Sequence, residues 1–301
     1  MAEKELIFLQ RYSVQALAIN DEAYPQRLLS LCDAPVLLFY KGTANLNPLR
    51  AISIVGTRRN TDYGKQITET LIGDLKPYDV TIYSGLAFGI DAIAHKSALK
   101  QGLQTVAVLA HGLASLYPPE HSQLSKEMIK QGGLITEYLS HVKADKHHFP
   151  NRNRIVAGIS DCTIVIETAV KGGSMITADL ANGYNREVFA YPGRSTDFKS
   201  AGCNWLIRNH QASLLQHSDQ LVKMMAWETE KISVDTQTKL FVELNEVEQR
   251  IMDLLGERDH IHIDVLNGTS GFPNSRNAGA LLELEMKDLI YSMPGRIYRL
   301  K

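Results

Sequence analysis

The stretch "AISIVGTRRNTDYGKQITETLIGDLKPYDVTIYS", residues 51–84, decides the fold of this chain. It opens and closes on short apolar runs, residues 51–56 and 79–84, which are typical of strands buried on both faces. Between them, residues 62–76 repeat apolar positions at helical spacing, which predicts an amphipathic helix. The stretch therefore predicts two parallel strands joined by a crossover helix.

The same alternation continues along the chain. A helical pattern covers residues 89–102, and further apolar runs at 104–110, 133–138, 162–167 and 187–192 predict four more strands. Because these runs are nearly continuous in apolar residues, we expect an α/β fold with a doubly wound, mostly parallel sheet.

The domain organisation follows from where this alternation begins and ends. Residues 1–50 are expected to be an N-terminal extension packing on the core, which spans residues 51–227. Residues 228–240 are polar and without a pattern, so they are expected to be a linker. In residues 241–301, three helical segments precede two short strands around Pro294 and Gly295. This order predicts a small C-terminal winged-helix-like domain.

Composition excludes several classes of protein. The net charge is −1 and the pI about 6.8, so binding of a polyanion would need a local basic patch. Residues 1–227 hold 23 Lys and Arg against 20 Asp and Glu, whereas residues 228–301 hold 9 against 13.

The three cysteines are far apart, which argues against a cysteine zinc site or a disulfide framework and favours a reducing cytoplasm. No apolar run approaches the ~18–20 residues of a membrane span.

Three glycine-bearing loops follow predicted strands. They carry Gly56 and Arg58, then Ser84 and Gly85, then Gly173 and Ser174. Loops at the carboxyl ends of parallel strands meet at one edge of a sheet, where backbone N–H groups and helix N-termini favour anions. Neither G-x-x-x-x-G-K-[ST] nor a G-x-G-x-x-G after a strand is present. We expect an anion-binding rim; glycines that serve only the turns are the alternative.

A second basic stretch, "KADKHHFPNRNRIVAGIS" at residues 143–160, leads into another predicted helix. Arg152 and Arg154 fall in its first turn, where the helix dipole is already positive and cations cost about 0.3–1 kcal/mol each. An anion bound by these arginines and Lys146 would offset that cost, and Phe149 could stack a base. The alternative is that the arginines pair with neighbouring carboxylates and Phe149 is core.

Other candidates have structural interpretations that we favour. Asp91 and His95 stand four apart on one predicted helix and could be an acid–base couple, but Asp91 would also stabilise the helix dipole and pair with His95. Glu167 ends a predicted strand and is expected to accept hydrogen bonds. His147 and His148 are adjacent with no third ligand, so no metal site is expected.

The blocks "SIVGTRRNTDYG", "YSGLAFGIDAIAHKSAL", "FPNRNRIVAGIS" and "GGSMITADLA" follow one another in an order and spacing that resemble the DprA/Smf family. The resemblance covers roughly residues 24–226. It implies a Rossmann-like core in a cytoplasmic bacterial protein that binds and protects single-stranded DNA and loads the RecA recombinase onto it during natural transformation. It further implies a homodimer, no catalytic activity and no cofactor.

Carried onto this sequence, the resemblance and the loops above give a set of expected DNA-binding residues: Gly56, Arg58, Ser84, Gly85, Lys146, Phe149, Arg152, Asn153, Arg154, Gly173 and Ser174. The family's dimer contacts imply an interface that contains Asn204, Trp205, Ile207 and Leu214.

An enzymatic alternative is a nucleoside-monophosphate phosphoribohydrolase of the lysine-decarboxylase-like family, which carries P-G-G-x-G-T-x-x-E. Here "KGGSMITAD" has Met175 and Ile176 in place of Gly and Thr, and Asp179 in place of Glu. The phosphate nest of that motif is therefore lost.

In the tail, Arg276 and Lys287 stand among acidic residues, so strong DNA binding by the winged helix is not expected.

Overall fold

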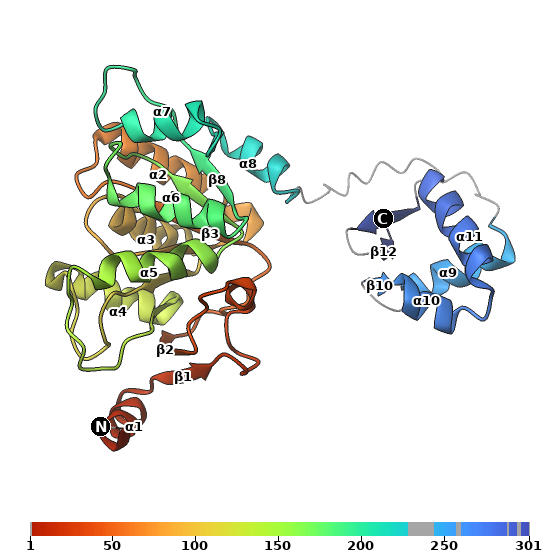
Figure 1. Ribbon diagram of the computed structural model, residues 1–301, viewed down its shortest axis with the longest axis horizontal. Coiled ribbons are helices and arrows are strands. Elements are labelled where there is room, and N and C mark those ends of the chain that lie inside the picture. The colour runs from red at the N-terminus through yellow and green to blue at the C-terminus, as the bar shows by residue number, and fades with distance from the viewer. Residues whose placement is uncertain (1, 228–243, 257–259, 288, 294–295, 301) are drawn as a thin grey trace. The chain divides into compact units, whose positions relative to one another are not determined.

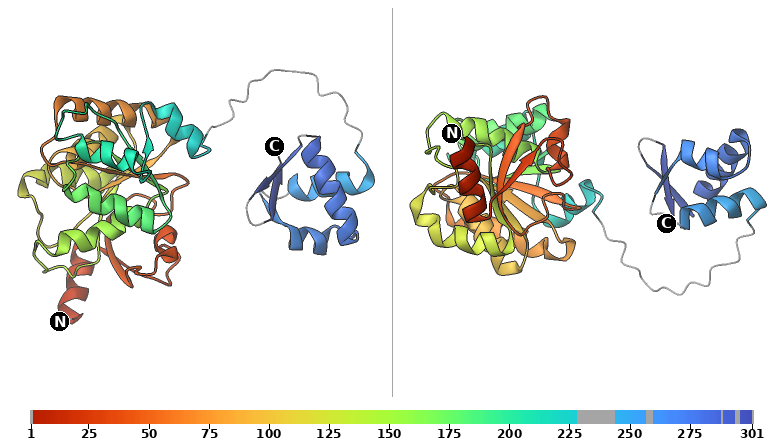
Figure 2. Two further views of the ribbon diagram at one scale, coloured as in Figure 1. Left: turned by 45° about the horizontal axis from the view of Figure 1, so that its top comes forward. Right: turned by 90° about the horizontal axis from the view of Figure 1, so that it is seen from below.

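The computed structural model describes residues 2–227, 244–256, 260–287, 289–293 and 296–300. It divides into a first compact unit, residues 1–229, and a second, residues 230–301 (Figures 1 and 2). The predicted linker, residues 228–240, lies outside the described residues.

A nine-stranded sheet forms the centre of the first unit, in the order β1-β2-β6-β5-β4-β3-β7-β8-β9. The strands from β3 to β9 are parallel. Six of them confirm the six predicted strands: β3 (Ala51–Val55), β4 (Thr81–Ser84), β5 (Thr105–Val108), β6 (Gly133–Thr136), β7 (Cys162–Val165) and β8 (Glu187–Ala190).

Helices cover both faces of this sheet, which confirms the doubly wound fold. One face packs against α5 (His148–Gly158), α6 (Gly173–Gly183) and α7 (Ala201–Arg208). The other packs against α2 (Asp62–Asp74), α3 (Ile90–Gln101) and α8 (Ser218–Met224), while α4 (Ser122–Gln131) extends this layer beside β5 and β6. In Figure 1, α5, α6 and α7 lie in front of the sheet.

Strand β3 shows why the apolar runs are continuous. Ala51 and Val55 belong to the core under α5 and α6, whereas Ile52 and Ile54 belong to the core under α2 and α3. Side chains alternate between the two faces of a strand, so a strand covered on both sides carries apolar residues toward both faces. β3 is also where the chain reverses its direction across the sheet, with β4 on one side and β7 on the other. Ligands in such sheets bind beyond the strand ends at this point.

The N-terminal extension does more than pack on the core. After α1 (Ala2–Tyr12), β1 (Gln15–Ala18) pairs antiparallel with β2 (Leu37–Gly42), and β2 pairs antiparallel with β6. A bidentate ion pair joins the extension to the central sheet, with Arg27 Nε 2.7 Å from Asp161 Oδ1. The sequence did not reveal these strands, because β1 has only four residues, and β2, although apolar over residues 37–40, is not followed by a helical pattern before β3.

The second unit has its own apolar core. Its elements are α9 (Glu246–Gly256), β10 (Ile261–His262), α10 (Ile263–Thr269), α11 (Asn274–Met286), β11 (Ile290–Met293) and β12 (Ile297–Leu300). The strands form an antiparallel sheet in the order β10-β12-β11. The predicted three helices and terminal hairpin are confirmed; Pro294 and Gly295 lie outside the described residues. Among the helices described, none has the length and apolar character needed to cross a bilayer.

Candidate nucleic-acid interface

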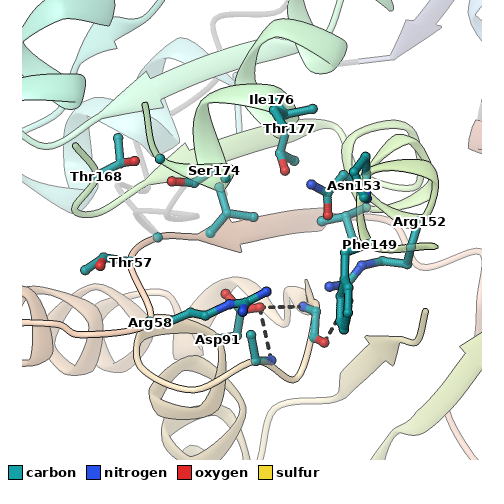
Figure 3. A pocket seen from close by; sticks show the side chains of 18 of the residues that line it. Thr57, Arg58, Asp91, Phe149, Arg152, Asn153, Thr168, Ser174, Ile176 and Thr177 are labelled. Atoms are coloured by element: carbon teal, nitrogen blue, oxygen red, sulfur yellow. Dashed lines mark hydrogen bonds between the residues drawn. The ribbon is translucent and has the colours of Figure 1, made fainter. Parts of the chain in front are cut away.

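A pocket of about 830 Å³ lies beyond the carboxyl end of β3, at the point where the strand order reverses (Figure 3). Its walls come from residues 55–59, 85–91, 144–156 and 168–177, together with Tyr117. Loops that are far apart in sequence therefore converge where the topology predicts a ligand site.

Arg58 enters the pocket from the loop after β3. Its neighbour Gly56 has to be small, because a Cβ there would lie 2.6 Å from Ile90 Cγ1. Gly89 has a φ of +79°, and Ile90 N–H donates to the Thr57 carbonyl over 3.2 Å, so two loop backbones are in direct contact. The exposed Arg58 guanidinium lies 5.4 Å from the centroid of the Phe149 ring. In the part of the chain that the structure describes, it makes no hydrogen bond or ion pair.

Lys146 enters from the segment between β6 and α5. Its side chain is exposed and, within the described ranges, has no acidic partner. The adjacent Asp145 also lines the pocket, but its Oδ1 already accepts a 2.9 Å hydrogen bond from the His147 N–H. Arg58 and Lys146 thus share one pocket without an acidic partner among the described residues.

The N-terminus of α6 lies in the pocket wall. Gly172 precedes the helix, and Gly173 and Ser174 begin it. Ser174 is 7% exposed, and its Oγ has no hydrogen-bond partner among the described residues. Backbone N–H groups at a helix N-terminus attract anions, and a buried hydroxyl beside them can donate to the same oxygen atoms.

Arg152 and Asp91 are two buried residues of opposite charge in the pocket lining, and both bind the backbone of Gly85. Arg152 Nη1 donates to the carbonyl oxygens of Gly85 and Val108, and Asp91 Oδ2 accepts from the Gly85 and Ala87 N–H groups over 3.2 and 3.3 Å. Burial raises the pKa of Asp91, partly offset by Arg152, and lowers the pKa of Arg152 to about 10. Arg152 therefore keeps its charge at neutral pH.

Nine of the eleven predicted DNA-binding residues line this pocket: Gly56, Arg58, Gly85, Lys146, Phe149, Arg152, Asn153, Gly173 and Ser174. Arg152 lines it with its Nη1 donating to backbone carbonyls, while its Nε has no hydrogen-bond partner among the described residues. The structure does not bring Ser84 and Arg154 there. Ser84 is buried and donates to the Ile54 carbonyl over 2.6 Å.

Arg154 points away from the pocket toward the N-terminal extension. It forms an ion pair with Glu137 and donates to the carbonyl of Asp33 over 2.6 Å. The alternative interpretation of its position, pairing with a neighbouring carboxylate, is therefore correct for Arg154. Residues on one helix that are two apart face different sides, so Arg152 and Arg154 cannot share a ligand.

The sequence did not single out several residues that line the pocket, among them Arg59, Tyr117 and Thr168. Arg59 adjoins Arg58 in the sequence, so its positive charge next to a predicted binding residue could have identified it as a pocket residue. Tyr117 belongs to the loop between β5 and α4 and has no sequence neighbour in the other pocket segments. Only the fold brings it there.

The residues proposed for acid–base chemistry have structural partners. His95 Nδ1 lies 2.6 Å from Thr105 Oγ1, not against Asp91. Glu167 is buried and accepts from the N–H and the hydroxyl of Thr61, over 2.9 and 2.7 Å. Asp179 is exposed on α6, and neither Glu167 nor Asp179 is among the residues that line the pocket.

The predicted dimer residues lie near the last strand of the sheet. The Asn204 side chain is hydrogen-bonded to both backbone groups of Gly193. Trp205 and Ile207 are partly buried and pack against the core. Leu214, on the edge strand β9 (Ser213–Leu214), is 42% exposed. Leu214 is therefore the most exposed of the four predicted dimer residues.

Comparison with known proteins shows which family this chain belongs to. The sequence profile described as DNA recombination-mediator protein A matches residues 15–226, and that of the DprA winged helix domain matches residues 241–296. Protein Smf of Escherichia coli is 32% identical over 303 residues, covering 99% of this chain and 81% of that protein. DNA processing protein DprA of Bacillus subtilis is 39% identical over 207 residues, covering 68% and 70%.

Two solved structures are similar to the first unit. DNA processing protein A from Streptococcus pneumoniae has a TM-score of 0.68 and 36% identity, covering 72% of this chain and 77% of that one. The protein from Helicobacter pylori has a TM-score of 0.65 and 30% identity, covering 71% and 96%, and its structure concerns a single-stranded DNA binding mode. With a core and a tail that both match, this chain belongs to the DprA/Smf family of DNA recombination-mediator proteins.

Proposed function

We propose that this chain binds single-stranded DNA in the pocket beyond β3. One observation carries the proposal: Arg58 and Lys146 come from separate loops, line the same pocket, and have no acidic partner in the described part of the chain. Unpaired cations beside a helix N-terminus offer phosphate ligands that the folded protein does not itself use. The relative from Helicobacter pylori, whose structure concerns single-stranded DNA binding, supports this choice of ligand.

The pocket favours a single strand over a duplex. Its lining combines phosphate ligands with the aromatic side chains of Phe149 and Tyr117, and only unpaired bases offer a free face to such rings. Every base has that face, so we expect little dependence on base sequence.

Fluorescence anisotropy with a labelled oligo-dT strand and the matching duplex, across a salt series, tests this function. Tight binding to the strand that weakens steeply with salt, with much weaker binding to the duplex, is the expected result. Equal affinity for strand and duplex, or no binding of either, would contradict the proposal.

We further propose that this chain protects the bound strand and loads the RecA recombinase onto it. We also propose that it acts as a homodimer in a reducing cytoplasm. Membership of the recombination-mediator family supports these roles. The test is the DNA-dependent ATPase of RecA on a strand coated with single-strand-binding protein. The chain should shorten the lag before RecA becomes active, and an unchanged lag would count against loading.

We also propose that the chain is not an enzyme. The carboxylates of Glu167 and Asp179, which a phosphoribohydrolase would need, lie outside the pocket lining. Release of free base from AMP tests this. Turnover that is abolished by Glu167→Gln or Asp179→Asn would overturn it.

A further inference from the structure

We propose that Tyr117 is the residue that stacks a nucleobase at the pocket, and that Phe149 instead positions Arg58 for a phosphate. This inference rests on the proposed binding of single-stranded DNA. It divides two functions between two rings in contact, whose centroids lie 5.8 Å apart at 60°.

Phe149 already has partners around its ring. Its side chain is half-buried, the Arg58 guanidinium lies over the ring at 5.4 Å, and Tyr117 adjoins it. A guanidinium over an aromatic face is held there by the ring quadrupole. A base could take that face only by displacing the cation that is to bind its phosphate. Phe149 is therefore better suited to holding Arg58 than to stacking.

Tyr117 combines an open ring with a fixed backbone. Its side chain is 47% exposed and lines the pocket. The Tyr117 N–H donates over 3.1 Å to Nε2 of His111, a residue that is 2% exposed. His111 Nδ1 lies 2.9 Å from the Gly112 carbonyl oxygen. Because Nε2 accepts this hydrogen bond, Nδ1 is the ring nitrogen that donates to Gly112. The ring of Tyr117 thus stands on an anchored loop beside the phosphate ligands.

The chain offers a matched control in Phe88. Its side chain is 42% exposed, close to the value for Tyr117, and it follows the pocket residue Ala87. Phe88 itself is not in the pocket lining, and its ring packs against His121 with centroids 5.0 Å apart. The Phe88→Ala variant tests whether an exposed aromatic side chain near the pocket, but outside its lining, also contributes to binding of bases.

The experiment crosses protein variants with DNA that has or lacks bases. Binding of oligo-dT and of a strand of equal length made of abasic sites is measured by anisotropy for the wild type, Tyr117→Ala, Tyr117→Phe, Phe88→Ala and Phe149→Leu. A stacked base contributes on the order of a tenfold change in affinity. We expect Tyr117→Ala to bind dT about tenfold more weakly while its affinity for the abasic strand is nearly unchanged. Tyr117→Phe and Phe88→Ala should match the wild type.

Phe149→Leu should weaken binding of both strands by the same factor, because Phe149 acts through Arg58 and the phosphate. If Tyr117→Ala loses equally on both strands, if Phe88→Ala loses as much as Tyr117→Ala, or if Phe149→Leu alone removes the dependence on bases, the assignment is wrong. If the wild type binds neither strand, the proposed function itself fails, which is a different result.

A second measurement does not depend on a destabilising truncation. Tyr117→Trp adds an indole at the proposed stacking position, above the background of Trp205 and Trp227 measured in the wild type. Its additional fluorescence should be quenched by oligo-dT and not by the abasic strand. Absence of quenching at saturating dT would overturn the assignment.

Discussion

The guanidinium of Arg152 donates a 2.7 Å hydrogen bond to the carbonyl oxygen of Gly85. Gly85 has to be glycine here, because a Cβ would lie 2.3 Å from Arg152 Nη1. From the other side, Asp91 accepts the Gly85 N–H. The strand-end loop is therefore held in place by a buried pair of opposite charges before any ligand arrives, which is how a binding site is preorganised.

Removing one member of this pair should destabilise the whole first unit. Arg152→Met removes the hydrogen bonds from the guanidinium to the Gly85 and Val108 carbonyls. Hydrogen bonds to charged groups are worth about 1.5–3 kcal/mol, so we expect a loss of at least that much unfolding free energy. Urea unfolding followed by circular dichroism measures this loss, with the exposed Arg59→Met as the control. A loss below about 1 kcal/mol, the size expected for a surface interaction, would show that Arg152 does not hold the loop at Gly85 in place.

Arg154 should matter for stability and not for DNA. Arg154→Met removes its ion pair with Glu137, in which the two side chains are 19% and 18% exposed, and its hydrogen bond to Asp33. Hydrogen bonds to charged groups are worth about 1.5–3 kcal/mol, so we expect a loss in that range. Affinity for oligo-dT, measured on the folded variant, should stay unchanged. A large loss of affinity would return Arg154 to the binding site.

His95 should make stability sensitive to acid. Burial lowers its pKa from the usual 6.5 to about 3, and its Nε2 has no hydrogen-bond partner among the described residues. Below pH 6.5 the unfolded chain binds a proton that the folded chain does not bind, so stability is complete above that pH and falls as the pH drops toward 3.

The effect can be isolated with His95→Gln, which does not titrate. Between about pH 7.5 and 5.5, the wild type should lose about 1.4 kcal/mol more unfolding free energy than the variant. Urea unfolding at the two pH values measures the difference. Parallel losses in both proteins would show that His95 takes up a proton in the folded state.

The edge strand β9 supplies the test of the proposed homodimer. Leu214 is 42% exposed there, whereas Leu206 nearby is fully buried in the core. Leu214→Glu places a charge on the proposed interface without opening the core, so light scattering after size exclusion should give the mass of a monomer, while Lys223→Glu on α8 leaves the dimer intact. A Leu214→Glu variant with the mass of the wild-type dimer would exclude this surface.

How far the sequence predicted the fold depended on burial. The six strands from β3 to β8 are buried on both faces and therefore read as apolar runs, which made them visible. β1 is the edge strand and is mostly exposed, whereas β2 beside it buries three consecutive residues but is not followed by a helical pattern that would mark it as a strand of the α/β repeat. The antiparallel pairing of β2 onto β6 depends on long-range contacts, and nothing in residues 1–50 alone specified it.

Site residues that directly follow a predicted strand could be predicted from the sequence. Site residues that reach the pocket only through the tertiary fold could not. Gly56 and Arg58 follow β3, so their place at the rim followed from topology. Arg152 and Arg154 look equivalent in the sequence, yet the helical rotation between them sends one beneath the pocket and the other to Glu137. Tyr117 comes from a separate loop, and no local pattern linked it to the others.

Whether the pocket binds the strand is tested by the salt dependence of oligo-dT binding by the wild type, Arg58→Ala and Lys146→Ala, with Arg276→Ala on α11 as the matched control. Each pocket variant should bind more weakly and lower the slope of log K against log salt by about 0.7, the value for one lost phosphate contact with a single strand. Arg276→Ala should retain both the affinity and the slope. If all three variants change affinity equally, or if the pocket variants keep the wild-type slope, the phosphate ligands lie elsewhere and the pocket is not the binding site.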